Sequence, residues 1–175
     1  ACLRHQDKFN INEDAIINGI QSARWPARLQ DLKDSRFGKL LPAGSELWLD
    51  GGHNPAAGQI LANHMAKQAL SQKPAPLYII CGMMANKDAF GFLRPLSSHV
   101  TELMGVEVIG EDSHPAEKIV EFAKRAGITA TTSPSVEQAL REIAAKDNGK
   151  MVRVLICGSL YLAGKILKQN DLLPD

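Results

Sequence analysis

The segment of residues 47–55 combines residue types that could bind a nucleotide or another anion. Asp50 ends an apolar run, two glycines follow it, and His53 comes directly before Asn54 and Pro55. Asparagine is a preferred N-cap residue and proline is favoured in the first turn, so this pair predicts the start of a helix. In an open α/β sheet, ligands bind in the loop between the carboxyl end of a strand and the next helix. The residue types are equally compatible with a plain strand end at Asp50 and a solvated loop residue at His53.

Two further charged positions could face the same edge of a sheet. Arg28 lies in a connector that contains Trp25 and Pro26, and a planar, permanently charged guanidinium suits a phosphate contact. A solvated arginine on a linker explains this residue as well. Lys87 follows a second apolar run, and Asp88 beside it is expected to cap a helix. Two loops that meet at one edge of a sheet favour a shared pocket.

The elements that would position these residues alternate between apolar runs and helical periodicity. This alternation predicts an α/β fold: a Rossmann-like three-layer α/β/α domain with a mostly parallel sheet of five or six strands. Residues 31–45 are expected to be polar and irregular, ending in a turn. The expected strands are 46–50, 77–81, 101–108, 128–132 and 152–157, and the expected helices are 12–20, 55–70, 88–96, 115–126, 136–146 and 160–168.

Composition excludes several classes of protein. The chain has 175 residues, 45% of them hydrophobic, which is enough for one domain with a core. A formal net charge of +1 gives no basic field for nucleic acid, and no apolar run is long enough to span a membrane. The three cysteines, Cys2, Cys81 and Cys157, are an odd number without paired spacing. Two of them lie in apolar runs, which favours buried, reduced thiols and a cytoplasmic location.

Several catalytic motifs are absent from the sequence. The segment 158–166 is not a P-loop, because its glycines are one residue too far apart and Ile166 stands where Ser or Thr is required. No Gly-x-Gly-x-x-Gly follows a strand, and no Gly-x-Ser-x-Gly elbow is present. The remaining histidines have no Cys or His partner at zinc spacing. The sequence therefore gives no metal ligands of its own.

Four segments, taken together and in order, resemble the C-terminal part of folylpolyglutamate synthase/dihydrofolate synthase, of the Mur ligase superfamily. The resemblance covers essentially the whole chain. Asp-x-x-His-Asn-Pro is shared across the superfamily, whereas Trp-Pro-x-Arg-Leu together with Gly-Ser-Leu-Tyr-Leu is more specific for the folate branch. The segments are Trp-Pro-Ala-Arg-Leu-Gln at 25–30, Leu-Asp-Gly-Gly-His-Asn-Pro-Ala-Ala at 49–57, Gly-Met-Met-Ala-Asn-Lys-Asp at 82–88 and Cys-Gly-Ser-Leu-Tyr-Leu-Ala-Gly at 157–164.

This resemblance implies a division of the chain and a role for its candidate residues. Residues 1–24 would be the tail of an N-terminal ATPase domain, 25–45 a linker, and 46–175 the Mur ligase C-terminal (glutamate ligase) domain. ATP would bind between the two domains, with the P-loop and the Mg²⁺ ligands in the N-terminal one. Arg28 would contact the ATP phosphates and Asp50 the ribose, with His53 and Asn54 near the nucleotide.

The sequence departs from the family pattern at two points. Ala27 stands where the family usually has a glycine before the linker arginine, which is expected to alter the local turn. The stretch between Arg28 and Asp50 is long and polar for the family, which predicts a loop insertion. Neither departure removes a side chain that the implied chemistry needs.

The implied activity is the ATP-dependent addition of L-glutamate to dihydropteroate and/or reduced folates, through an acyl phosphate, in folate biosynthesis. The intact enzyme is expected to be a cytoplasmic monomer that binds neither nucleic acid nor membrane. The chain begins at Ala1 rather than Met, so we expect a fragment that is inactive by itself. The alternatives are a peptidoglycan-precursor Mur-type amino acid ligase domain and a non-catalytic Rossmann-like nucleotide-binding module.

Overall fold

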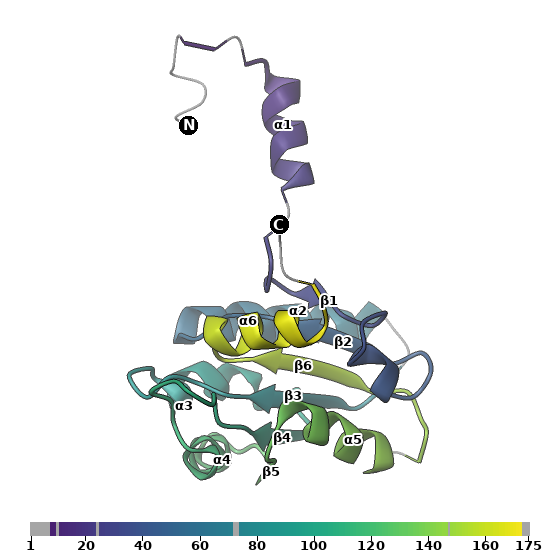
Figure 1. The fold of residues 1–175 in the computed structure, drawn as a ribbon, viewed down its shortest axis with the longest axis vertical. Helices are drawn as coiled ribbons and strands as arrows, with labels where there is room; N and C mark the ends of the chain where they lie inside the picture. Colours follow the sequence, from purple (N-terminus) through teal and green to yellow (C-terminus); the bar gives the residue numbers. More distant parts are fainter. Residues whose placement is uncertain (1–7, 10, 24, 72–73, 147, 173–175) are drawn as a thin grey trace.

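The structure is a computed structural model that describes residues 8–9, 11–23, 25–71, 74–146 and 148–172. Cys2 and His5 lie outside these residues. A six-stranded sheet in the order β1-β2-β6-β3-β4-β5 forms its centre (Figure 1). The strands are β1 (Gln30–Asp31), β2 (Glu46–Leu49), β3 (Leu77–Cys81), β4 (Glu102–Gly105), β5 (Ala130–Thr132) and β6 (Arg153–Cys157).

The helices cover both faces of this sheet and make the three layers that the sequence predicts. The α-helices are α1 (Glu13–Ser22), α2 (Pro55–Ser71), α3 (Ala89–Leu93), α4 (Ala116–Arg125), α5 (Val136–Lys146) and α6 (Leu160–Gln169), with 3-10 helices η2 (Gly38–Leu40) and η3 (Arg94–Leu96). Buried side chains of α2, α3 and α4 form one core cluster with one face of the sheet. Those of α5 and α6 form the other cluster.

Strand direction brings the candidate residues to one edge. Strands β2 to β5 and β6 pair in parallel, and only β1 runs antiparallel, against β2. Alternate residues of a strand face opposite layers, so Leu47 and Leu49 join one core cluster and Trp48 the other. The carboxyl ends of β2, β6 and β3 therefore lie side by side, and the loops after them carry Asp50, Gly158 and Lys87 (Figure 1).

The prediction of irregular structure over residues 31–45 is wrong in part. This segment includes the end of β1 and the 3-10 helix η2, and it buries Leu32 and Phe37 in the core. The buried side chain of Asn170, at the end of α6, accepts a hydrogen bond from the Phe37 N–H at 2.9 Å. A few apolar side chains within a polar stretch thus tie it to the domain, which the average polarity of the stretch conceals.

Two other predicted elements differ in length. The strand expected at 101–108 has ladder geometry only over Glu102–Gly105. The helix expected at 88–96 divides into α3 and η3, where Pro95 cannot donate a backbone hydrogen bond. Helix α1 lies apart from the sheet (Figure 1), and none of its residues is buried as far as the structure describes the chain. No helix in the described ranges is both long and apolar enough to cross a membrane.

Candidate functional site

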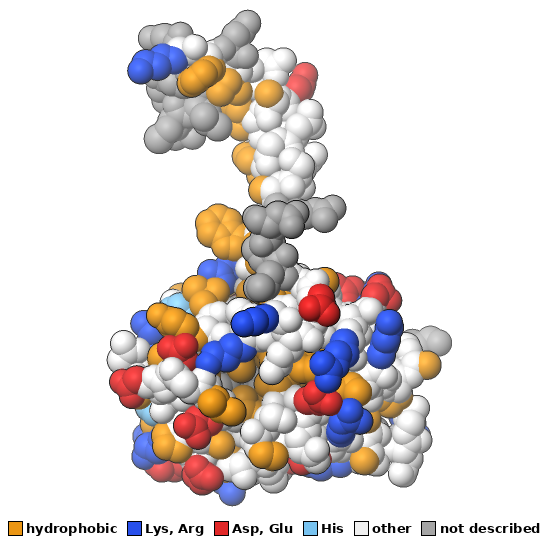
Figure 2. Space-filling view, in the orientation of Figure 1, with side chains coloured by type: hydrophobic (Ala, Val, Ile, Leu, Met, Phe, Trp, Pro, Cys, Tyr) orange, Lys and Arg blue, Asp and Glu red, His pale blue; other side chains and the backbone are white. Residues whose placement is uncertain are grey.

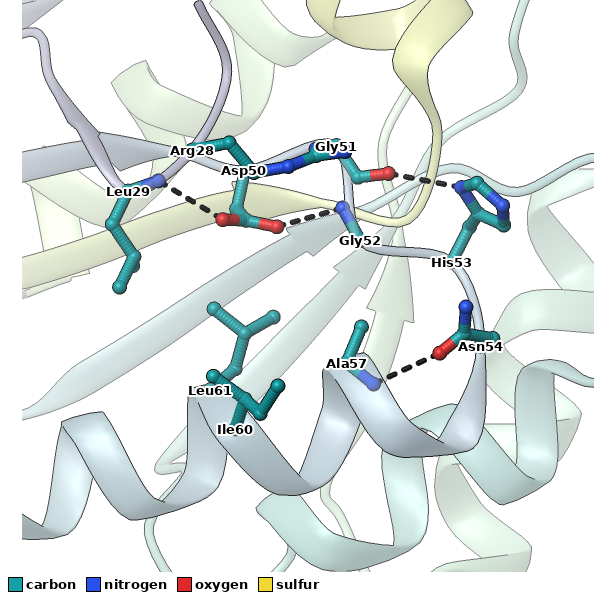
Figure 3. A pocket seen from close by; sticks show the side chains of 10 residues that line it. All are labelled: Arg28, Leu29, Asp50, Gly51, Gly52, His53, Asn54, Ala57, Ile60 and Leu61. Atoms are coloured by element: carbon teal, nitrogen blue, oxygen red, sulfur yellow. Dashed lines mark hydrogen bonds between the residues drawn. The ribbon is translucent and has the colours of Figure 1, made fainter. Parts of the chain in front are cut away.

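A cavity of about 200 Å³ opens at the carboxyl end of β2, between the linker, the β2–α2 loop and the first turns of α2. Figure 3 shows its lining side chains and the hydrogen bonds among them. All four predicted site residues, Arg28, Asp50, His53 and Asn54, line this cavity. The structure therefore brings the predicted residues together, although they come from two separate segments.

The Asp50 carboxylate lies at the centre of the site and is 7% exposed. Its Oδ2 accepts a hydrogen bond from the Leu29 N–H at 2.9 Å, and its Oδ1 accepts one from the Gly52 N–H at 2.7 Å. The backbone N–H of Asp50 donates to the Ile156 carbonyl of β6. One side chain thus joins the linker to the β2–α2 loop. Each carboxylate oxygen keeps a further lone pair that can accept a ligand hydroxyl.

Arg28 is carried by a turn of unusual backbone conformation, residues 27–29, which we call the linker turn. Ala27 has a φ of 55° and Leu29 has a φ of 42°. Both values lie in the left-handed region, which residues other than glycine rarely adopt. The Ala27 carbonyl accepts hydrogen bonds from Arg28 Nη1 at 3.1 Å and from the Gly51 N–H at 2.9 Å. The exposed guanidinium therefore lies beside the glycine loop.

Side chains pack closely around Gly51, in the loop after β2. A Cβ atom at this position would lie 3.1 Å from Arg28 Nη1, and it would overlap the side chain of Leu160, the first residue of α6. The linker turn, the β2–α2 loop and the start of α6 thus meet at one point. Ser159 caps α6 by accepting hydrogen bonds from the N–H groups of Tyr161 and Leu162, as expected for a serine at a helix start.

His53 and Asn54 use their side chains to order the loop. His53 Nδ1 lies 3.0 Å from the Gly51 carbonyl, so a hydrogen on Nδ1 is donated there and Nε2 is left for other partners. Asn54 Oδ1 accepts a hydrogen bond from the Ala57 N–H at 2.9 Å and caps α2. The predicted helix start at Asn54-Pro55 is confirmed. The Asn54 amide nitrogen remains directed to the outside of the cap, where a ligand can accept from it.

An apolar wall lines the cavity next to the Asp50 carboxylate, and the sequence did not indicate that these residues belong to the site. Leu29, Ile60 and Leu61 form this wall, and Figure 3 shows their side chains in the gap between the linker and α2. Ile60 is 65% exposed although it lies on a helix that packs on the sheet. No pattern in the sequence distinguishes Ile60 from the buried apolar residues of α2, because its exposure is seen only in the structure.

Lys87 does not line this cavity, so the expected shared pocket is not formed. Its loop is held instead by the segment after β4: the Ala85 N–H donates to the Asp112 carbonyl, and the His114 N–H to the Met83 carbonyl. Asp88 caps α3 through the Gly91 N–H, as predicted. The Lys87 loop is therefore a neighbouring structure at the same edge of the sheet.

Two thiols lie directly behind the site. Cys81 and Cys157 are opposite each other on β3 and β6, and both are buried and free, as the sequence predicts. A hydrogen bond with Cys81 and burial raise the pKa of the Cys157 thiol well above its usual range. The Cys157 thiol is therefore expected to stay protonated, and burial shields both thiols from reagents. Among the residues that the structure describes, no three His, Cys, Asp or Glu side chains are grouped to hold a metal ion.

Comparison with known proteins places the chain in a family. The family model for the C-terminal domain of dihydrofolate synthetase matches residues 36–169. Dihydrofolate synthetase of Saccharomyces cerevisiae is 24% identical over 97% of this chain, and dihydrofolate synthase/folylpolyglutamate synthase of Escherichia coli is 27% identical over 93%. The chain spans only 40% and 35% of the length of these two enzymes.

The fold agrees with that of solved enzymes of this kind. One is a bifunctional folylpolyglutamate synthase/dihydrofolate synthase with Mn, AMPPNP and L-glutamate bound, which is similar over 96% of this chain and 37% of its own, with a TM-score of 0.73 and 25% identity. The family model covers well over half of the 175 residues and includes all of the loop after β2 and all of α6. The chain therefore belongs to the family of dihydrofolate synthetase C-terminal domains.

Proposed function

We propose that this chain is the C-terminal domain of an ATP-dependent ligase that adds L-glutamate to dihydropteroate and/or reduced folates. The observation that carries the proposal is the meeting of Arg28 with the Asp50–Asn54 loop on one cavity, in a chain of this family. The enzymes with related sequences are named for these two activities. A structurally similar enzyme binds an ATP analogue, Mn and L-glutamate.

We assign the cavity to one side of the ATP molecule. Its volume of about 200 Å³ is smaller than the roughly 300–1,000 Å³ of typical small-molecule pockets, which supports a site completed by another domain. The Leu29, Ile60 and Leu61 wall suits the apolar face of a purine. Asp50 would accept a ribose hydroxyl, and Arg28 would contact the phosphates, where a planar cation binds oxygens well. His53 and Asn54 would lie near the nucleotide, at the N-terminus of α2.

We assign the rest of the active site to a preceding ATPase domain. This chain has no P-loop, and its described residues do not offer a group of side chains for a metal ion, so a P-loop and Mg²⁺ ligands would come from that domain. Ile17 and Ile20 of α1 are exposed, and hydrophobic side chains gather along one side of this helix in Figure 2. We propose that residues 1–24 belong to the preceding domain and that the exposed apolar side of α1 packs against it.

The chemistry would proceed through an acyl phosphate. A carboxylate of the pterin-linked substrate attacks the γ-phosphate of ATP and releases ADP. The amino group of L-glutamate then attacks the acyl carbon, releases phosphate and forms an amide. Phosphoryl transfer depends on positioning and on cations that stabilise the developing charge. Arg28 would supply one of these cations from the C-terminal side.

The test is kinetic and uses the complete gene product that contains this chain. Arg28→Ala is expected to lower the turnover of ATP- and glutamate-dependent ligation by about 10²–10³-fold, the range for removal of one preorganised donor. Arg36→Ala is the control, because Arg36 is an exposed arginine that pairs with Glu137 away from the cavity. Unchanged kinetics of Arg28→Ala would return Arg28 to the role of a solvated linker residue.

We also propose that residues 1–175 alone do not catalyse ligation, and that the complete enzyme is a cytoplasmic monomer. The first part follows from the assignment of the P-loop to another domain. Measurable ligation by the isolated chain with ATP, L-glutamate and dihydropteroate would contradict it. Sedimentation of the complete enzyme as a dimer would contradict the second.

A further inference from the structure

The linker turn is a conformation that its own residues do not favour. Ala27 and Leu29 both adopt left-handed φ values, 55° and 42°, on either side of Arg28. Residues other than glycine are disfavoured in this backbone conformation, which persists only where the surrounding structure holds it. The direction of the Arg28 side chain depends on these two φ angles, because they set how the backbone enters and leaves Arg28.

Two side chains hold this turn, one on each side of Arg28. The Gln30 Oε1 accepts a hydrogen bond from the Ala27 N–H at 2.9 Å. The Asp50 Oδ2 accepts one from the Leu29 N–H, also at 2.9 Å. Gln30 itself is fixed, because it starts β1 and pairs with Leu49 of β2. The sheet therefore supports the turn through Gln30 as well as through Asp50.

We infer that Gln30 is a positioning residue, whose side-chain oxygen locks the linker turn and so aims Arg28 at the mouth of the cavity. Gln30 does not line the cavity and would not touch ATP. Without its Oε1, the part-buried Ala27 N–H loses its partner, and the turn can relax to a commoner conformation. The catalytic part of this inference rests on the proposed function of Arg28, whereas the structural part does not.

The first experiment measures the turn itself by NMR in the 175-residue chain. Gln30→Met removes the acceptor at nearly constant side-chain length, and Gln30→Glu keeps an acceptor oxygen at the same place. Gln138→Met is the control, since Gln138 is exposed on α5 and its side chain donates to Glu142 of the same helix. Gln30→Met is expected to speed hydrogen exchange of the Ala27 amide about tenfold, the factor for one lost hydrogen bond. In the same variant, the HN–Hα coupling constant of Ala27 is expected to shift away from the value for a φ of 55°.

Gln30→Glu and Gln138→Met are expected to leave both signals at Ala27 close to wild type. Unchanged exchange and coupling in Gln30→Met would overturn the inference. Equal effects of Gln30→Met and Gln30→Glu would overturn it as well, because the acceptor would then not be what matters.

The second experiment measures catalysis in the complete gene product. Gln30→Met is expected to lower kcat about tenfold, the same factor by which it speeds hydrogen exchange of the Ala27 amide. Gln30→Glu is expected to retain most of the activity. In an Arg28→Ala background, Gln30→Met is expected to have no further effect, since residues that act through one another are not additive. Full additivity of the two changes would overturn the positioning role. If Arg28→Ala alone leaves kcat unchanged, the proposed function of Arg28 fails, and the Ala27 exchange still decides whether Gln30 locks the turn.

Discussion

The replacement of Asp50 by asparagine tests the hydrogen bonds that join the linker to the β2–α2 loop. The carboxylate accepts two backbone N–H groups, Leu29 at 2.9 Å and Gly52 at 2.7 Å. An asparagine has one acceptor oxygen, so its NH₂ group must face one of these donors. The contact with Gly52 is local, whereas the contact with Leu29 spans 21 positions in the chain. We therefore expect the oxygen to stay with Gly52 and the Leu29 N–H to lose its partner.

The expected loss of stability follows from these contacts. A hydrogen bond to a charged group contributes about 1.5–3 kcal/mol, and an unpaired buried donor costs about 1–3 kcal/mol when its partner is removed. These two values describe the same lost contact, and the retained bond to Gly52 also weakens when its acceptor becomes neutral. We expect Asp50→Asn to lower the free energy of unfolding by about 2–3 kcal/mol.

Urea unfolding of the chain, followed by circular dichroism, measures this loss. With a slope of about 2 kcal/mol per molar urea, the midpoint should fall by roughly 1–1.5 M. Asp88→Asn is the matched control, because Asp88 is an exposed N-cap and asparagine caps helices equally well. A midpoint for Asp50→Asn within about 0.3 M of wild type, at the same slope, would refute the account of this carboxylate.

Three further predictions concern the linker turn, the thiols and a surface ion pair. Ala27→Gly removes the strain of a left-handed φ of 55°, and this gain offsets the greater entropy of glycine in the unfolded chain. The free energy of unfolding should therefore stay within about 1 kcal/mol of wild type. A larger loss in urea unfolding would show that the Ala27 backbone is not strained. Cys81 and Cys157 should resist iodoacetamide in the folded chain and react only after unfolding, because they are buried and the pKa of Cys157 is raised. Peptide mass spectrometry measures the labelling, and alkylation of either cysteine in the folded chain would contradict this prediction. The hydrogen bond from Arg141 lowers the pKa of Glu137. The contribution of this ion pair to stability is therefore present above the ordinary carboxyl pKa and is lost as the pH falls through the lowered value. Arg141→Met should raise the Glu137 pKa in an NMR titration, and an unchanged pKa would count against the pair.

The layered fold and the place of the site could be predicted from the sequence because both follow from periodic patterns. Apolar runs indicate buried parallel strands, and a strand that ends in Asp50 before Asn54-Pro55 fixes a loop at the carboxyl edge. The family match confirms the folate branch that the combination of Trp-Pro-x-Arg-Leu and Gly-Ser-Leu-Tyr-Leu indicates.

The linker turn could not be predicted, because it depends on contacts between distant residues. The glycine that is usual in the family at position 27 is a sign of an unusual turn, but the positive φ of Ala27 itself depends on the Gln30 and Asp50 side chains around it. The packing of Phe37 against the end of α6 is likewise hidden, since its partner Asn170 lies 133 positions away. A polar segment looks irregular until the few side chains that anchor it are seen in place.

The most direct test of the central claim is a crystal structure of the complete gene product with a non-hydrolysable ATP analogue and a divalent metal ion. We expect the nucleotide to contact the cavity at the carboxyl end of β2. Its ribose should lie at Asp50, its phosphates at Arg28 and its base against Ile60. A nucleotide bound away from the cavity, with Arg28 and Asp50 making no contact to it, would contradict the claim.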